Sequence, residues 1–268
     1  MSSDRMAIAQ ATAQRVVADG VQSIEDPVAV EAPLEIRVET RPVSVTMRTP
    51  GADEELALGF LWTERVLSSR DDVLDIRAEG DRVDVFLRPE TPFDFARLSR
   101  HVFASSSCGV CGKASVELAM QTGDRLDPED RLSVTPDAIH GLPDRLRAAQ
   151  SVFDATGGLH AAALCDSAGQ VVVAREDVGR HNAADKVIGW RVLSDANADS
   201  TPILMVSGRV SFEIVQKALA ARIPLIAAVS APTSLAIELA KESGVTLIGF
   251  LRSGRFNLYA HPHRVLGP

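Results

Sequence analysis

The sequence is poor in cysteine, in positive charge and in long apolar runs, and each shortage excludes a class of protein. Three cysteines, a small and odd number, argue against a disulfide framework and are typical of a reducing cytoplasm. The 28 lysines and arginines are outnumbered by 36 aspartates and glutamates. The resulting net charge of −8 argues against broad nucleic-acid binding, so an anionic ligand would need a local basic pocket.

Membrane insertion and secretion are also argued against by what is missing. The most apolar run, residues 223–229, is short and interrupted by Pro224, so it cannot span a bilayer. The N-terminus lacks the apolar core of a signal peptide, and no solenoid-length repeat is visible. These features predict a cytoplasmic protein of one large or two modest domains within the 268 residues.

The first third of the chain predicts a small α+β domain over residues 31–104. Apolar and polar residues alternate over 34–38 and 43–47, and again over 73–78 and 82–87, which indicates two hairpins of half-buried strands. Between them an amphipathic helix begins near Asp53, a candidate N-cap, and runs for about four turns. Residues 1–30 are weakly patterned, and we expect a loosely ordered segment with at most one short strand at 14–17.

The second half predicts an α/β domain over residues 135–268. A helix over 135–150 and a hairpin over 159–165 and 170–175 come first. Unbroken apolar strands at 203–206, 225–229 and 245–251 then alternate with helices at 180–193, 212–222 and 234–243. Unbroken apolar strands imply a sheet covered on both faces, and the hairpin makes the sheet mixed. The expected fold is therefore a three-layer α/β/α domain with a mixed sheet.

Polar turns follow the strands of this domain where helices begin. In such folds ligands bind where strand ends meet helix starts, and free backbone N–H groups there favour phosphate. Any one of these turns is more often a helix cap, but together, with several arginines, they favour a phosphate-rich ligand. The candidate binding residues in the turns are Arg180, His181, Ser207, Gly208, Arg209, Ser230, Thr233, Phe250, Leu251, Arg252, Ser253, Gly254 and Arg255.

A glycine-rich loop with a Cys108-x-x-Cys111 pair, within an inter-domain segment at 105–134, is the sharpest chemical signal. Its length excludes a phosphate loop of the G-x-x-x-x-G-K type, and a thioredoxin-like dithiol lacks its flanking βαβ pattern. Half of a zinc site and a nucleophilic or sulfur-handling cysteine stay open as equal readings. Cys165, in an apolar run, is expected in the core, and His160 is expected to be structural.

Several segments occur in one order that resembles a known family. They are Ser107-Cys108-Gly109-Val110-Cys111-Gly112, Gly157-Gly158-Leu159-His160-Ala161-Ala162, the run from Glu176 to Lys186, Ser207-Gly208-Arg209, Ser230-Ala231-Pro232-Thr233 and the turn at 250–255. From about Pro33 to the C-terminus the chain resembles the formate dehydrogenase accessory sulfurtransferase family, the FdhD family. The resemblance implies a core similar to the cytidine deaminase fold and a homodimer.

The resemblance also implies a sulfurtransferase activity. Cys108 would accept sulfur from a cysteine desulfurase as a persulfide, with Cys111 as its partner. The sulfur would pass to the molybdenum, or tungsten, of the bis-molybdopterin guanine dinucleotide cofactor, which is handed to apo formate dehydrogenase. The family's cofactor-binding turn maps onto residues 250–255. We expect no metal site of the protein's own.

Two alternative functions compete with this activity. A zinc deaminase would carry H-x-E before P-C-x-x-C, whereas here the C-x-x-C precedes His160 and Ala162 stands at the glutamate position. The sequence therefore argues against a deaminase despite the implied fold. A non-catalytic chaperone that binds and delivers the molybdenum cofactor would need the arginine turns but not Cys108.

Overall fold

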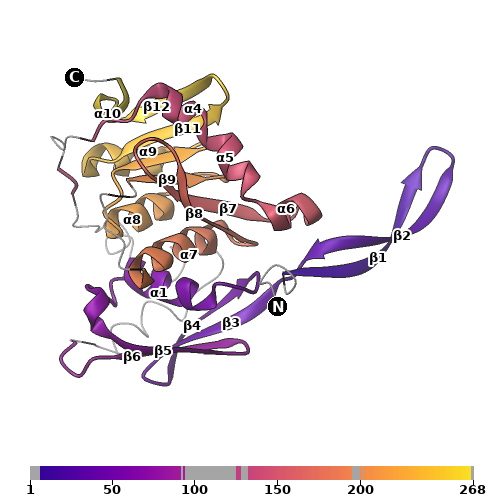
Figure 1. Ribbon diagram of the computed structural model, residues 1–268, viewed down its shortest axis with the longest axis horizontal. Helices are drawn as coiled ribbons and strands as arrows, with labels where there is room; N and C mark the ends of the chain where they lie inside the picture. Colours follow the sequence, from indigo (N-terminus) through magenta and orange to yellow (C-terminus); the bar gives the residue numbers. More distant parts are fainter. Residues whose placement is uncertain are drawn as a thin grey trace.

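The computed structural model describes residues 7–91, 93, 125–127, 132–194, 200 and 202–266. The predicted C-x-x-C loop, including Cys108 and Cys111, lies outside these residues. The described strands form a two-stranded, a four-stranded and a six-stranded sheet (Figure 1). No helix within the described ranges is both long and apolar enough to cross a membrane.

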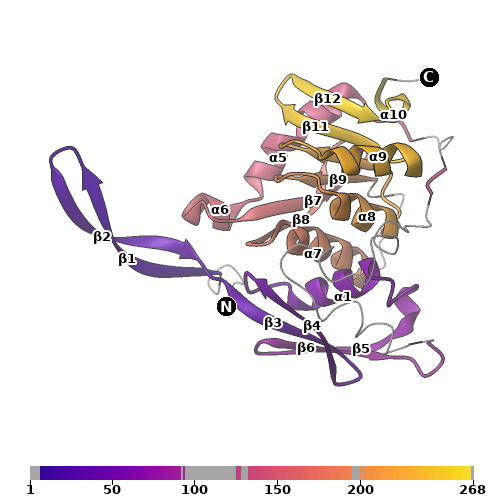
Figure 2. The ribbon, with the colours of Figure 1, turned by 180° about the vertical axis from the view of Figure 1, so that it is seen from behind.

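The N-terminal segment differs from expectation, because it forms a long hairpin that projects from the rest of the molecule (Figures 1 and 2). β1 (Ile8–Val17) pairs with β2 (Gly20–Ala29) in antiparallel register from Ile8↔Ala29 to Val17↔Gly20. The prediction of a loosely ordered segment with one strand at 14–17 was therefore wrong for residues 8–29. Both faces of the ribbon are largely exposed, so its residues carry no burial alternation that would reveal it.

The small α+β domain has the predicted hairpins. It contains β3 (Ala32–Val38), β4 (Arg41–Arg48), α1 (Asp53–Thr63), the 3₁₀ turn η2 (Arg70–Asp72), β5 (Val73–Glu79) and β6 (Arg82–Leu87). Its sheet order is β4-β3-β6-β5, with β3 and β6 parallel. The buried members of the alternating strands pack on the apolar side of α1. Asp53 does not cap α1: Ala52 holds that position, and Asp53 pairs with Arg48 at 2.9 Å.

The C-terminal domain is the predicted α/β fold with a mixed sheet. Its helices and strands are α4 (Pro136–His140), α5 (Leu142–Ala148), α6 (Ser151–Thr156), β7 (His160–Cys165), β8 (Val171–Asp177), α7 (Arg180–Leu193), β9 (Ile203–Val206), α8 (Phe212–Ala220), β10 (Leu225–Ala228), α9 (Ser234–Ser243), β11 (Thr246–Arg252), β12 (Arg255–Ala260) and α10 (His263–Leu266). The order is β12-β11-β10-β9-β7-β8. Strands β9, β10 and β11 are parallel, whereas β7 is antiparallel to both its neighbours and β12 is antiparallel to β11.

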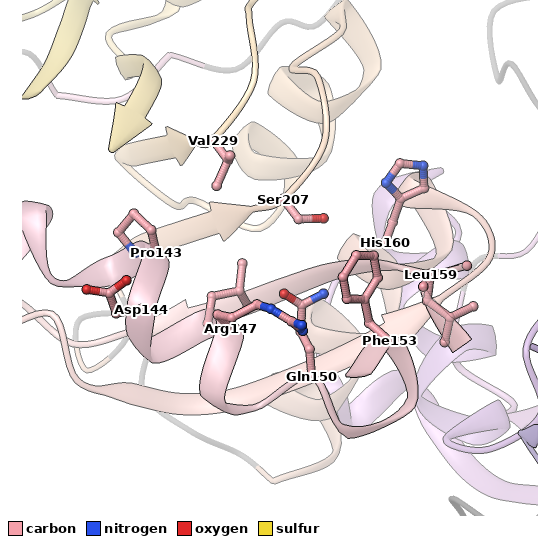
Figure 3. Close-up of a pocket in the computed structure, with 12 residues that line it drawn as sticks. Pro143, Asp144, Arg147, Gln150, Phe153, Leu159, His160, Ser207 and Val229 are labelled. Carbon is pink, nitrogen blue, oxygen red and sulfur yellow. The ribbon is translucent and has the colours of Figure 1, made fainter. Parts of the chain in front are cut away.

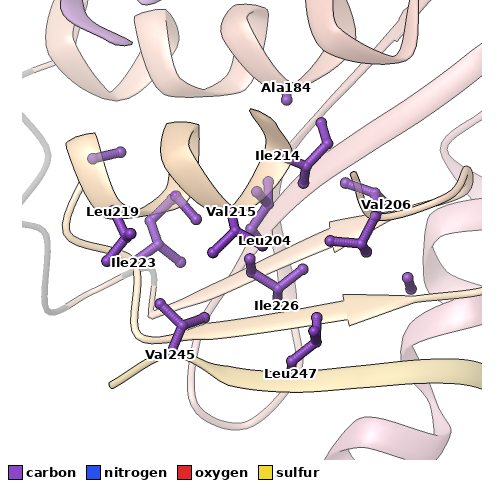
Figure 4. Close-up of a cluster of buried hydrophobic side chains, with 14 of the residues drawn as sticks. Ala184, Leu204, Val206, Ile214, Val215, Leu219, Ile223, Ile226, Val245 and Leu247 are labelled. Atoms are coloured by element: carbon purple, nitrogen blue, oxygen red, sulfur yellow. The ribbon is translucent and has the colours of Figure 1, made fainter. Parts of the chain in front are cut away.

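Two apolar clusters lie on the two faces of this sheet, so the three predicted layers are present. Successive residues of a strand point to opposite faces. Leu204 therefore joins the cluster with α7, α8 and α9 (Figure 4), while Met205 joins the cluster with α4, α5 and α10. The closer resemblance to the cytidine deaminase fold is compatible with this architecture and stays a prediction.

Two local predictions for this domain were incomplete. The single helix expected over 135–150 is divided: α4 ends at His140, α5 begins at Leu142, and Pro143 in the first turn of α5 has no N–H to continue the ladder. The sequence predicts no strand after 251, but the chain turns at Ser253-Gly254 and returns as the edge strand β12. Gly254 has φ 81°, a backbone conformation that favours glycine.

The two domains pack backbone to backbone where α1 crosses α7. A Cβ on Gly59 would lie 1.8 Å from the Asp185 carbonyl oxygen, and one on Gly189 would lie 1.8 Å from the Glu55 carbonyl oxygen. The absence of side chains at both positions therefore lets the two helix backbones approach. Trp62 adds a hydrogen bond from its indole N–H to the Ala220 carbonyl, at 3.0 Å. The domains thus form a single packed body.

Candidate functional site

The sheet topology brings the predicted polar turns to one edge of the sheet, the edge formed by the carboxyl ends of β9, β10 and β11. Strands β9, β10 and β11 are parallel, so the turns that follow them lie side by side. The antiparallel pairing of β7 places His160 opposite Asp177 and Ala162 opposite Val206, so the start of β7 joins the same edge. Backbone contacts link neighbouring turns, for example from Phe250 N to the Ser230 carbonyl at 3.1 Å. The convergence expected for an α/β fold is therefore present.

A cavity of about 650 Å³ lies between this edge and helices α5 and α6 (Figure 3). Its volume falls within the range of about 300–1,000 Å³ that is typical of small-molecule sites. Its lining residues are Pro143, Asp144, Leu146, Arg147, Gln150, Phe153, Gly157, Gly158, Leu159, His160, Ser207 and Val229. Of the predicted binding residues only Ser207 lines it directly.

The predicted turn at 250–255 borders the cavity. The Arg252 guanidinium donates to the Val229 carbonyl at 2.5 Å, and the Ser253 hydroxyl donates to the Asp144 carboxylate at 3.3 Å. Gly254 and Arg255, the next residues along the chain, are exposed. Phe250 is 46% exposed, and its backbone has a φ of 52°, in the left-handed region. Leu251 is fully buried and serves the core. The turn therefore reaches the cavity through Arg252 and Ser253, which bind the lining residues Val229 and Asp144.

A second basic group lies around His160. Burial lowers the pKa of His160 most, the neighbouring Arg180, His181 and Arg209 lower it further, and Asp177 partly opposes them. The imidazole is therefore neutral at pH 7. A Cβ on Gly208 would lie 3.3 Å from His160 Nδ1, so glycine leaves room for the ring. From the sequence, His160 is expected to be structural, whereas the structure places it in the cavity lining. The Gly157-Gly158 pair nearby is the sequence feature that indicates exposed backbone beside a cavity.

Not all predicted residues reach this site. His181 Nε2 lies 3.0 Å from the Glu213 carboxylate and 3.2 Å from the Ser211 hydroxyl, so its ring is directed at α8 rather than at the cavity. The Thr233 hydroxyl accepts from Ala236 N at 3.3 Å and caps α9. Ser230 contributes its carbonyl to Phe250. Arg209 is exposed, and Arg180 has a buried Nε with no hydrogen-bond partner in the described part of the chain.

The segment from Glu176 to Lys186 holds the two domains together. Lys186 Nζ lies 2.7 Å from Asp177 and donates to the Thr49 carbonyl at 2.8 Å, and Thr49 N donates back to Asp177 at 3.1 Å. Asn182 donates to Asp177 at 2.9 Å and to the Met47 carbonyl at 2.7 Å. Lys186 and Asn182 thus bind backbone carbonyls of the first domain.

Glu176 positions one wall of the cavity. Its carboxylate accepts from Val152 N at 2.9 Å and from Phe153 N at 2.8 Å, which satisfies two free N–H groups at the start of α6. Arg175, one residue earlier, pairs with Glu55 of α1 at 2.6 Å. The same short stretch therefore fixes both the domain interface and the cavity wall.

Cysteine chemistry at the described residues is limited to Cys165. It is fully buried in β7, as expected, and burial raises the pKa of its thiol to about 12. Cys165 is therefore unsuited to act as a nucleophile. The predicted catalytic pair Cys108 and Cys111 lies outside the described residues. Within those residues no group of three or more histidine, cysteine, aspartate or glutamate side chains is arranged to hold a metal ion.

Comparisons with known proteins agree over nearly the whole chain. The model of the FdhD/NarQ family matches residues 29–266. A protein of Mycobacterium tuberculosis named sulfur carrier protein FdhD is 47% identical over 272 residues, which cover 95% of this chain and 99% of the relative. A protein of the same name from Streptomyces coelicolor is 49% identical over 263 residues, 93% of each.

A solved structure gives the same picture. The crystal structure of a protein from Desulfotalea psychrophila, described as a formate dehydrogenase accessory protein, superposes with a TM-score of 0.78. The two are 25% identical, and the match covers 97% of this chain and 99% of that one. The family match begins at residue 29, so the projecting β1–β2 hairpin precedes it.

Proposed function

The chain belongs to the FdhD/NarQ family, and on that basis we propose that it is a sulfur carrier protein that serves formate dehydrogenase. Its donor would be a cysteine desulfurase, and its acceptor would be the molybdenum of the bis-molybdopterin guanine dinucleotide cofactor. The cofactor is bound here as cargo and passes to apo formate dehydrogenase. The names of the relatives support the sulfur-carrying role, and the chemistry of the site supports the cargo.

The observation that carries the cargo assignment is the convergence of arginine-bearing turns around one cavity. Arg252 donates to the carbonyl of Val229, which lines the cavity, and Arg180 and Arg209 lower the pKa of His160, which also lines it. Guanidinium groups suit bidentate phosphate binding, and each guanine dinucleotide carries a diphosphate. A local basic site of this kind reconciles an anionic cargo with a net charge of −8.

The proposed sulfur transfer takes two balanced steps. The Cys108 thiolate attacks the terminal sulfur of the desulfurase persulfide, a new S–S bond forms on Cys108, and the desulfurase cysteine leaves as a thiolate. The Cys111 thiolate then attacks Cys108 Sγ, a Cys108–Cys111 disulfide forms, and the terminal sulfur leaves as hydrosulfide for the metal. The two electrons come from the dithiol, which an external thiol reductant regenerates.

Intact-protein mass spectrometry tests the carrier role. After incubation with cysteine and a cysteine desulfurase, wild type should gain the mass of one sulfur atom that a reductant removes. Cys108→Ala should abolish the gain. Cys165→Ala is the matched control and should keep it, because Cys165 is buried and its thiol has a raised pKa. Sulfur gain by Cys108→Ala would overturn the assignment.

A maturation assay separates the carrier from a non-catalytic chaperone. Cys108→Ala should bind the cofactor but fail to activate formate dehydrogenase. Activation by this variant would leave the cofactor-binding chaperone as the surviving function. We also propose that the protein works in the cytoplasm as a homodimer, and light scattering on the purified chain tests the dimer.

A further inference from the structure

The β1–β2 ribbon is anchored at its base only. Ile8 and Ala29 pack there on the apolar cluster that contains Val152 of α6 and Leu159. Beyond its base the ribbon extends away from every other element that the structure describes (Figures 1 and 2). A two-stranded hairpin on its own is at best marginally stable in water. Two strands of ten residues each would therefore be stabilised by a partner that covers them.

The two faces of the ribbon carry different side chains. Residues paired across antiparallel strands point to the same face, and successive pairs point to opposite faces. The hydrogen bond from Thr12 to Glu25, at 2.7 Å, lies on the more polar face, which has Val16 and Val21 at its tip. The other face, called the apolar face below, carries the pairs Ala9↔Val28, Ala11↔Asp26, Ala13↔Ile24, Arg15↔Gln22 and Val17↔Gly20. All of these residues are exposed or half-buried, so the described part of the chain leaves this face uncovered.

Two opposite charges lie on the apolar face at equal distances from its middle. The central pair is Ala13↔Ile24, with Asp26 in the next pair toward the base and Arg15 in the next pair toward the tip. Neither charge forms an ion pair with a residue that the structure describes. If two ribbons lie face to face in opposite directions about a two-fold axis at the central pair, the pair with Arg15 covers the pair with Asp26 at both ends. The face is therefore complementary in charge to a second copy of itself, which a two-fold contact requires.

We propose that the apolar face of the ribbon is a contact between two copies of this chain, whose ribbons cross in opposite directions. Ala13 of each copy faces its symmetry mate at the axis, where the small side chain lets the ribbons approach, and Arg15 pairs with the partner's Asp26. The inference rests on the proposed homodimer, for which it names the contact surface. The family match does not supply it, because that match begins at residue 29.

This arrangement gives the ribbon a role at the cavity. The tip of each ribbon lies beside the base of the other ribbon, because the two run in opposite directions. The base packs on Phe153 and Leu159, which also line the cavity. The contact would therefore bring the tip of one copy close to the cavity wall of its partner.

Sedimentation of the purified full chain over a range of concentrations tests the contact. Wild type should sediment as two chains of 28.7 kDa each. Ala13→Glu places two carboxylates against each other at the axis, so it should raise the Kd of self-association at least about tenfold. Gln14→Glu is the matched control, because it adds the same charge one residue later on the opposite face. It should leave the Kd unchanged, and equal thermal midpoints of the two variants confirm that both are folded.

A charge exchange between copies tests the crossed direction. Arg15→Glu and Asp26→Arg should each weaken self-association, because each leaves like charges facing each other across the contact. An equal mixture of these two variants should form heterodimers with an affinity close to that of wild type, since every facing pair is then opposite in charge. Charges that acted only within one chain would not be restored by mixing.

Each other outcome overturns the inference in a distinguishable way. A dimeric Ala13→Glu with the Kd of wild type, or a mixture that stays monomeric, would leave the homodimer standing but move it to another surface. A monomeric wild type would overturn both the homodimer and the ribbon contact. Loss of desulfurase binding by Ala13→Glu without loss of the dimer would assign the apolar face to the desulfurase instead. None of these results touches the sulfur step, which the Cys108→Ala assays decide separately.

Discussion

The buried ion pair between Lys186 and Asp177 predicts a large and specific loss of stability when it is broken. The two side chains are 2% and 0% exposed, and the Lys186 ammonium also donates to the Thr49 carbonyl. Lys186→Met keeps most of the volume but leaves the Asp177 carboxylate buried without its cation. Removing one partner of a buried pair costs about 3–5 kcal/mol. A native protein has only about 5–15 kcal/mol in total, so the variant should be visibly weakened.

Urea unfolding followed by circular dichroism measures this loss, and the chain offers a matched control. Arg77 and Asp75 lie at the same distance, 2.7 Å, but their side chains are 71% and 44% exposed. Arg77→Met should therefore lose less than about 1 kcal/mol. The double variant Lys186→Met/Asp177→Asn should lose less than the sum of its single variants, because no charge is stranded. Equal losses at the buried and the exposed pair would refute the reasoning.

Three further outcomes are expected. Gly189→Ala should lower the free energy of unfolding by at least about 1–3 kcal/mol, because its Cβ would lie 1.8 Å from the Glu55 carbonyl oxygen; an unchanged thermal midpoint would contradict this packing. In a chain lacking Cys108 and Cys111, Cys165 should resist iodoacetamide at pH 8 until the protein is unfolded, since its pKa is raised to about 12; mass spectrometry of the folded protein detects any labelling. His160 has a pKa below its ordinary 6.5, so below that pH the unfolded chain binds its proton more tightly and stability falls. His160→Asn should show a smaller fall between pH 7 and pH 5 in urea titrations, and an identical fall would speak against the shift.

Much of the C-terminal fold is predictable because its strands are buried on both faces. Helices 180–193 and 234–243 begin and end as the sequence indicates. Strand 203–206 is an unbroken apolar run, which is typical of a strand covered on both faces. The edge strand β12 could not be predicted in the same way. It is mostly exposed or half-buried, so its sequence has neither an apolar run nor a strict alternation that would indicate a strand.

The N-terminal hairpin was missed for a related reason. A ribbon without a core has little apolar alternation, and its Ala18-Asp19 turn before Gly20 was the only local sign. Predictions of this kind depend on burial, and this element has almost none.

The candidate site shows a different limit. The sequence locates the charged residues in the turns, but it does not show which side chains they contact. His181 is an attractive phosphate ligand by position, yet Glu213 on the next helix binds it.

The interlock between Thr49 and the Asp177–Lys186 pair has a consequence for how this protein can be recombined. Arg180, at the rim of the site, begins the helix that the first domain clamps through Lys186. Because Lys186 and Asp177 bind backbone atoms of Thr49, a chimera that joined the C-terminal half of one relative to the N-terminal half of another would keep this contact whatever residue stood at position 49. The Arg175–Glu55 pair joins two side chains across the domains, so it would survive only if the new N-terminal half also carried a carboxylate at position 55.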